Sequence, residues 1–440
     1  MSDAQGGGRN ASRSNDYWAS SAWCVVAAFG AYFCMYAFRK PFTAGAYADF
    51  TLWGLAYKPL LVIAQVLGYT LSKFLGIKVV AEVRPERRVA LLLALIGAAE
   101  LSLLLFALTP PPFNLCWLFL NGLPLGMVFG LVLGFVEGRR NTEALAAGLC
   151  TSFIVADGVV KSTGAWLLAQ GVSQYWMPFA AGLLFLPPLL VFAWMLARVP
   201  APSAADVAAR SERAPMNGAE RREFFRRYAP GLTLLAVIYL LVTLLRSLRA
   251  DFAPEIWKGL AVTIAPDVFA RSETAVAAGV LLLNGSAVFF RNNRQAFFAA
   301  LGLAAGGALL IGGSLLGLST GQLSPFNFMV LNGLGLYLPY IGIHTTVFER
   351  LIAMTRDRGN ISYLLYLVDA YGYLGYVGVL LGRNLFNAGE SFLSFFITLS
   401  WVVAGACLVL LIPCWRYFAT HPATHAKAAT RVLSESQTPA

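Results

Sequence analysis

About twelve apolar runs follow one another along this chain of 440 residues, and each is long enough to cross a lipid bilayer. A transmembrane helix needs about 17–25 mostly apolar residues, because the hydrocarbon core is about 30 Å thick. Charged residues make up only 12% of the chain, whereas a soluble protein carries about 25%. The chain therefore lacks the charge to cover a water-exposed surface. The pattern predicts an all-α integral membrane protein.

Short polar connections separate the predicted spans. The run at 229–250 is the clearest, whereas Asn284 and Gly285 interrupt the run at 272–290. The predicted spans cover residues 17–40, 58–77, 88–109, 114–137, 144–169, 175–198, 229–250, 272–290, 295–318, 326–349, 361–383 and 391–415.

A longer polar segment divides these runs into two sets of six that resemble one another. Leu120-Asn121-Gly122-Leu123 recurs as Leu331-Asn332-Gly333-Leu334. At a similar spacing of about 210 residues, Asp157 matches Asp369 and Arg39 matches Arg246, as expected for a duplicated unit. We therefore expect about 12 transmembrane helices in two pseudo-symmetric six-helix bundles. The expected parts are a tail at 1–16, a first bundle at 17–198, a linker at 199–228, a second bundle at 229–417 and a tail at 418–440.

Lysine and arginine gather in alternate connections, which indicates orientation. Arg84, Arg139 and Arg350 lie in three basic connections, whereas the connections at 110–113 and 319–324 contain neither residue type. Basic connections face the cytoplasm, so we expect both termini and the linker there, in a multi-pass protein of the cell (inner) membrane. We expect the second half of the linker to form an amphipathic helix on the membrane surface. We also expect a monomer.

The net charge of +11 does not indicate a nucleic-acid partner, because the basic residues are dispersed among the connections between spans. No P-loop, dinucleotide-binding, zinc-protease or nucleophile-elbow motif occurs. The three histidines and six cysteines form no spacing typical of a metal site. We therefore expect no enzymatic activity, no metal and no cofactor, and a small molecule and the bilayer as the partners.

Charged residues inside a span cost free energy unless they are paired or hydrated, so each is a candidate functional residue. Arg39 shares a helical face with Tyr32 and Tyr36, and Arg246 shares one with Tyr239. The planar fork of donors in arginine suits phosphate or carboxylate. The alternative is that each arginine extends to the membrane interface. We favour substrate binding for this pair, because the alternative does not explain the matching faces.

Lys73 follows Gln65 and Tyr69 on one face, and substrate binding and extension to the interface are equally supported for it. Asp157 and Lys161 lie four residues apart, and we favour an intrahelical ion pair over a role in coupling. Further candidates for coupling or ion pairing are Glu100, which has no partner in its own span, Asp369, which shares a face with Tyr366 and Tyr373, and His344, which shares one with Tyr337 and Tyr340.

Three segments resemble the major facilitator superfamily, and within it the antiporters that exchange glycerol-3-phosphate or hexose phosphate for inorganic phosphate. They are Tyr36-Ala37-Phe38-Arg39-Lys40-x-Phe42, Ser72-Lys73-Phe74, and Leu244-Leu245-Arg246 followed by Asp251, Phe252 and Pro254. The resemblance implies that Arg39 and Arg246 bind phosphate and that Lys73 lines the same cavity. The superfamily loop after the second span and the histidine of the antiporter group's fifth span are not present.

These observations favour a secondary active transporter that moves a small anionic, phosphorylated solute by alternating access, in exchange for phosphate. One alternative is a proton-coupled symporter of an uncharged or zwitterionic solute, with Glu100, Asp157 or Asp369 as the proton carrier. A second alternative is a membrane sensor that does not transport.

Overall fold

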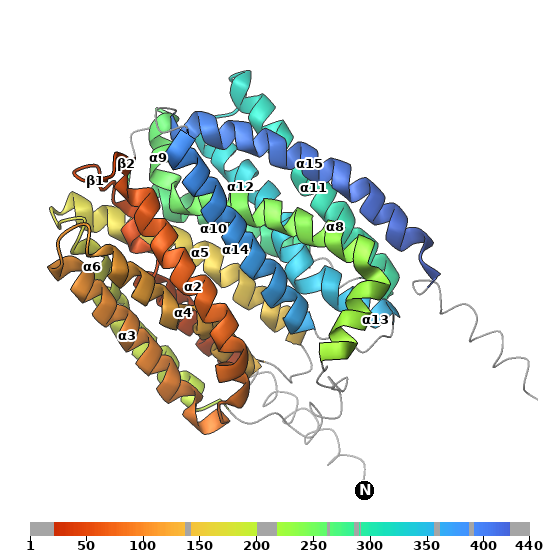
Figure 1. Ribbon diagram of the computed structural model, residues 1–440, viewed down its shortest axis with the longest axis horizontal. Helices are drawn as coiled ribbons and strands as arrows, with labels where there is room; N and C mark the ends of the chain where they lie inside the picture. Colours follow the sequence, from red (N-terminus) through yellow and green to blue (C-terminus); the bar gives the residue numbers. More distant parts are fainter. Residues whose placement is uncertain are drawn as a thin grey trace, which may run out of the picture. The chain divides into compact units, whose positions relative to one another are not determined.

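The computed structural model describes residues 22–136, 142–199, 218–261, 265–285, 290, 292–355, 361–386 and 391–422 (Figure 1). Helices dominate this part of the chain, and a helix overlaps every one of the predicted spans. The long helices are Ala22–Phe38, α2 (Tyr57–Glu82), α3 (Arg88–Leu108), α4 (Leu115–Val136), α5 (Thr142–Ala169), α6 (Met177–Ala197), α8 (Gly218–Asp251), α10 (Val268–Gly285), α11 (Asn293–Ser319), α12 (Pro325–Ile341), α14 (Ile361–Phe386) and α15 (Phe392–Thr420).

Polar side chains at the helix starts explain several of these boundaries. The Ser324 and Ser391 hydroxyls accept hydrogen bonds from the backbone N–H groups of Asn327 and Ser394, and the Asn292 amide oxygen accepts one from Arg294. Each bond satisfies a donor that the first turn of a helix leaves unpaired. The sequence thus fixes the starts of α11, α12 and α15 locally.

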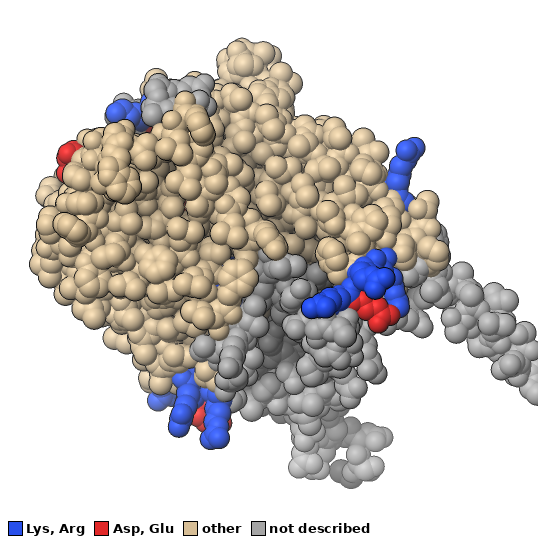
Figure 2. All heavy atoms as spheres, in the orientation of Figure 1, with Lys and Arg blue, Asp and Glu red and all other residues tan. Residues whose placement is uncertain are grey.

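Length and composition allow eight of the described helices to cross a membrane. The Ala22–Phe38 helix is shorter, and α5, α10 and α14 include charged residues such as Lys161, Glu273 and Asp369. Large apolar side chains lie exposed on the helices, for example Leu282 at 77% and Val409 at 66%. Figure 2 shows a face whose described surface is almost all uncharged, with Lys, Arg, Asp and Glu only near its margins. The chain is therefore an all-α integral membrane protein.

The chain divides into two compact units. The first contains Met1–Arg210 and Ala265–Thr274, and the second contains Ser211–Ile264 and Ala275–Ala440. The boundary near residue 210 falls inside the predicted linker. The sequence did not predict that the start of α10 belongs to the first unit.

Glycines allow a close crossing of α2 and α4 in the first unit. A Cβ atom at Gly68 would lie 2.0 Å from the carbonyl oxygen of Phe119, and one at Gly122 would lie 2.2 Å from that of Gln65. Both obstacles are backbone atoms, which cannot move aside without disrupting a helix. A larger side chain at either position would therefore separate the two helices. In the second unit, Gly307 of α11 and Gly335 of α12 meet in the same way.

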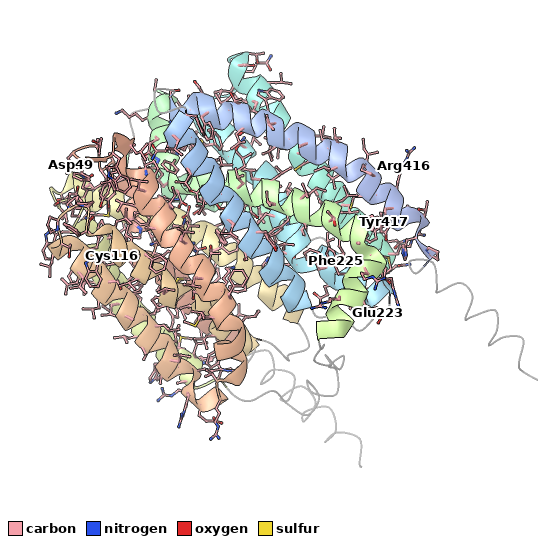
Figure 3. The ribbon with its side chains drawn as sticks, viewed as in Figure 1. Asp49, Cys116, Glu223, Phe225, Arg416 and Tyr417 are labelled. Atoms are coloured by element: carbon pink, nitrogen blue, oxygen red, sulfur yellow. The ribbon has the colours of Figure 1, made fainter. Side chains whose placement is uncertain are left out.

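The start of α8 agrees in part with the helix predicted for the second half of the linker. The residues from Gly218 to Arg227 are helical, and a kink at Tyr228 (φ −114°, ψ 18°) separates them from the rest of α8. Pro230 accounts for the kink, because it lacks the N–H group that would bond four residues back. The Tyr417 hydroxyl of α15 donates a 3.3 Å hydrogen bond to the carbonyl oxygen of Arg227. Figure 3 shows Tyr417 beside the turns of α8 that include Phe225.

The predicted span at 326–349 is also not one regular helix. It consists of α12, a π-helical segment η5 (Gly342–Val347) and the short helix α13 (Phe348–Thr355). Such segments are rare and often occur at functional sites. Further short elements are the 3-10 turns η1 (Tyr36–Phe38), η2 (Pro41–Ala44) and η3 (Pro85–Arg87), the helix α9 (Ala253–Gly259), and a hairpin of β1 (Thr51–Leu52) and β2 (Leu55–Ala56).

Candidate functional site

Arg39 lies at the end of the first helix, where the backbone tightens into η1. Its backbone N–H bonds to the carbonyl oxygen of Tyr36 at 3.1 Å, and its own carbonyl oxygen accepts a 2.9 Å bond from the Gln65 amide. Its guanidinium carbon lies 3.7 Å from the centroid of the Tyr69 ring. The residue is only 4% exposed, whereas an arginine extended to the membrane interface would keep its head in water.

Lys73 lies over the same tyrosine, with its Nζ atom 5.3 Å from the Tyr69 centroid. It is 8% exposed, so in this structure its ammonium group does not reach an aqueous surface. Tyr32 and Tyr36 are buried with their rings in edge contact at 5.6 Å. We call Tyr32, Tyr36, Arg39, Tyr69 and Lys73 the first-unit cluster.

Asn121 of α4 holds the first-unit cluster in position. Its amide nitrogen donates 3.0 Å bonds to the carbonyl oxygens of Phe38 and Ala99, and its oxygen accepts a 2.8 Å bond from Gln65. These bonds join the end of the first helix to α2, α3 and α4. The prediction gave Asn121 no role, although its repeated Leu-Asn-Gly-Leu motif was a signal that could have identified it.

Asp157 and Lys161 form the predicted pair within α5. The Lys161 ammonium donates to Asp157 Oδ2, and both side chains are buried. The charges thus lie in contact inside one helix, which reduces the cost of burying each of them.

Glu100 lies apart from the predicted cations. Its carboxylate occupies the space beside Gly182 of α6, where a Cβ atom would lie 2.1 Å from Oε2. Among the described residues, neither carboxylate oxygen accepts a hydrogen bond, and no ion pair joins Glu100 to a cation. Gly182 therefore leaves the space that this carboxyl group occupies.

Arg246 repeats the arrangement of Arg39 in the second unit. It lies on α8, is 8% exposed, and its guanidinium carbon lies 4.4 Å from the centroid of Tyr340 of α12. The prediction treated Tyr69 and Tyr340 only as members of helical faces. In the structure, each of these tyrosines provides the ring under a buried arginine.

Tyr239 connects two further predicted residues in the second unit. Its hydroxyl donates a 2.7 Å bond to Asp369 Oδ1 of α14 and lies 3.3 Å from His344 Nδ1 in the π-helical segment η5. The rings of Tyr239, Tyr340 and His344 are nearly parallel, with interplanar angles of 17° to 23°. The structure therefore brings four predicted residues, Tyr239, Arg246, His344 and Asp369, together around Tyr340.

A third polar group near the end of α8 was not predicted as a site. Arg249 donates a 2.9 Å bond to the carbonyl oxygen of Met329, and Tyr376 donates one of 2.9 Å to Asp251. All three polar side chains are buried. The charges of Arg249 and Asp251 at the end of a predicted span were the sequence signal that could have identified this group.

The connections outside the spans contain a separate polar network. Gln174 and Tyr175 donate bonds of 2.7 and 3.1 Å to the Asp49 carboxylate. Burial, together with the Asp49 carboxylate, raises the pKa of the Tyr175 hydroxyl to about 12. A hydroxyl held neutral remains a donor, so this network ties the connection before β1 to the one between α5 and α6.

Two solved structures with the fold of major facilitator transporters are similar to this chain. A D-xylose-proton symporter has a TM-score of 0.59 at 13% identity, with 90% of this chain and 97% of that chain covered. The nucleoside transporter NupG has a TM-score of 0.58 at 13% identity, with 91% and 100% covered. At such low identity the likeness shows the fold, two pseudo-symmetric six-helix bundles, and not the substrate.

No curated protein matches the sequence. The resemblance to the organophosphate antiporters therefore stays a prediction. The profile of one family, described as a family of unknown function (DUF5690), matches residues 41–421. This match covers well over half of the chain, which therefore belongs to the DUF5690 family.

Proposed function

We propose that this protein is a secondary transporter that moves a small anionic, phosphorylated solute by alternating access. The observation that carries the proposal is that each half of the chain buries an arginine over a tyrosine ring, Arg39 over Tyr69 and Arg246 over Tyr340. Stacking engages the face of a guanidinium group, whereas its N–H donors lie in the plane and suit the oxygens of a phosphate or carboxylate.

The chemistry of the first-unit cluster supports an anion over an uncharged solute. Arg39 and Lys73 bring two positive charges to one tyrosine ring. Two like charges near one another in a low-dielectric region repel, and a bound anion relieves that repulsion. A doubly charged phosphate satisfies more of these donors than a sugar hydroxyl does. We therefore propose Tyr32, Tyr36, Arg39 and Lys73 as residues that bind the solute in the first half.

The fold supports the transport part of the proposal. The two solved proteins of similar fold are a D-xylose-proton symporter and a nucleoside transporter. We propose that this chain also works by alternating access, as a monomer in the inner membrane with both termini in the cytoplasm. Exchange for inorganic phosphate is the mode that we propose first.

A panel of solutes tests this function. Purified protein in liposomes preloaded with inorganic phosphate is offered labelled phosphate, glycerol-3-phosphate, glucose-6-phosphate, a dicarboxylate and xylose. We expect uptake of the phosphorylated solutes, and a strong reduction in Arg39→Lys and Arg246→Lys. Arg84→Lys is the matched control, because Arg84 is exposed in a connection between spans. Uptake of xylose with no uptake of any anion would overturn the proposal.

One observation favours a second candidate function. The hydrogen-bonded set of Asp369, Tyr239 and His344 contains two groups that can take up a proton. Such a set suits a proton-coupled symporter, even of an uncharged solute. The xylose arm of the panel, measured with and without a pH gradient, separates this candidate from the anion exchanger.

A further inference from the structure

We infer that Asp369, Tyr239 and His344 form a proton-binding triad that couples one proton to the movement of the anion bound by Arg246. The inference rests on the proposed function, for which it names the coupling ion. It also separates the matching buried aspartates Asp157 and Asp369 by role, because only Asp369 belongs to the triad.

The two halves treat their matching aspartates differently. Asp157 is followed four residues later by Lys161, which donates to it within α5. Asp369 is followed four residues later by Tyr373. Asp157 and Lys161 are a buried ion pair, in which loss of either charge would leave the other uncompensated. A hydroxyl partner from Tyr239 can serve either protonation state of Asp369.

The hydrogen bonds of Tyr239 define the path of the proton. A tyrosine hydroxyl has one hydrogen, and the 2.7 Å bond directs it to Asp369 Oδ1. At 3.3 Å, the Tyr239 oxygen then accepts from Nδ1 of His344. When His344 is in its doubly protonated, positively charged form, Nδ1 passes its proton to this oxygen while the tyrosine passes its own hydrogen to the Asp369 carboxylate, so one proton has moved and Tyr239 is unchanged. His344 loses that proton and Asp369 gains it, so the charges balance.

The π-helical segment η5 gives His344 its place in this path. A π turn adds a residue to the helix and changes the direction of the side chains that follow it. Around η5, a Cβ atom at Gly342 would lie 3.4 Å from Asn284 Oδ1 of α10 and 4.0 Å from the carbonyl oxygen of Ala300 of α11. The two neighbours are a side-chain amide and a backbone carbonyl, so η5 packs closely against α10 and α11 at this glycine.

The charged and titratable groups around the triad explain how it senses the anion. Arg246 faces it from α8, Tyr337 and Tyr340 from α12, and Tyr373 from α14. Arg246 and Asp369 both act electrostatically on Tyr340, so their opposite charges both lie near this ring. An anion bound by Arg246 is repelled by a charged Asp369, and a proton on Asp369 removes that repulsion. Each ligand therefore favours binding of the other, as linkage requires.

The first measurement uses inorganic phosphate as the probe. The protein in liposomes is assayed for labelled phosphate exchange without a gradient, and for net phosphate uptake driven by an inward proton gradient. We expect Asp369→Asn and Tyr239→Phe to reduce gradient-driven uptake, relative to exchange, to the value seen without a gradient. The double variant Asp157→Asn/Lys161→Met is the matched control, because it removes the equivalent aspartate together with its cation, and it should keep the ratio of the wild type.

The second measurement needs no substrate. Infrared spectroscopy of the purified protein over a pH series detects the absorption of protonated carboxyl groups. We expect one component that responds to pH in the wild type and in the Asp157→Asn/Lys161→Met control, and that is lost in Asp369→Asn. His344→Gln should shift the pH at which this component changes, because the neighbouring proton donor is gone.

The outcomes separate the two proposals. If the wild type exchanges no anion of the panel but Asp369 titrates, the proposed function fails and the triad stands as a proton site. If the wild type exchanges phosphate and a gradient still drives uptake in Asp369→Asn, the triad is wrong and the proposed function stands. Persistence of the full infrared component in Asp369→Asn likewise overturns the triad.

Discussion

Arg39 stacks on Tyr69, with 3.7 Å between the guanidinium carbon and the ring centroid. The contact joins the end of the first helix to the middle of α2 and stabilises a buried positive charge with the negative face of an aromatic ring. Arg246 and Tyr340 have the same relationship in the second unit. The planar fork, and not charge alone, is the property that a solute with several oxygens would use.

Replacement of either arginine by lysine should therefore reduce transport although it keeps the charge. Loss of one charge-assisted hydrogen bond costs about 1.5–3 kcal/mol, which corresponds to about 10- to 100-fold in rate. We expect a decrease of this size for Arg39→Lys and Arg246→Lys in phosphate exchange. Size-exclusion profiles and thermal unfolding should be close to those of the wild type. Normal exchange in both variants would show that these arginines are anchors and not ligands.

Asp157→Asn should destabilise the protein, because it leaves the buried ammonium of Lys161 without its carboxylate. Removing one partner of a buried ion pair costs about 3–5 kcal/mol. The further change of Lys161→Met removes the isolated charge and should recover much of the loss. Thermal unfolding of the wild type and these two variants in detergent measures both steps. A double variant no more stable than Asp157→Asn would argue against a structural role for the pair.

Gly182→Ala should destabilise the packing of α3 against α6, because the new methyl group meets the carboxylate of Glu100. Overpacking of this kind costs about 1–3 kcal/mol. In a Glu100→Ala background the same change should cost little, since the obstacle has gone. Thermal unfolding of the four proteins in this cycle gives the interaction between the two positions. Equal costs in both backgrounds would mean that Glu100 turns aside.

The predicted orientation can be tested with reporters. Fusions at the C-terminus and in the linker before α8 should report the cytoplasm, because basic residues gather in these segments. Alkaline phosphatase should be inactive and green fluorescent protein active at both positions. A fusion at Ser173, in the connection between α5 and α6, is the control and should give the opposite result. Phosphatase activity from the linker fusion would reverse the assigned orientation.

The sequence predicted the helices well because membrane thickness dictates their length. A long apolar run is stable as a helix across the membrane and in few other arrangements, so hydropathy alone predicts where such helices begin and end. The pair of Asp157 and Lys161 was also predictable, because residues four apart share a helical face whatever the rest of the fold does. These features depend only on local order.

Contacts between distant residues were beyond such reasoning. The bond from Tyr239 to Asp369 joins α8 to α14, and that from Asn121 to Phe38 joins α4 to the first helix. Spacing along the chain says which residues share a face but not which faces meet. The π-helical segment at His344 packs against α11, and its residues carry no propensity signal for a π turn. The kink in α8 could have been predicted in part from the sequence, because Pro230 lies within an apolar helix.

The hydrogen bond from the Tyr417 hydroxyl to the carbonyl oxygen of Arg227 joins the end of the second half of the chain to its beginning. The ring of His421 lies 5.1 Å from that of Tyr228, so the chain leaves this half beside the place where it begins. Cleavage of the chain before α8 would give a C-terminal fragment whose two ends already lie side by side, held by the contacts of Tyr417 and His421. A short linker at this point would therefore be enough to join the two ends in a circularly permuted version of this half.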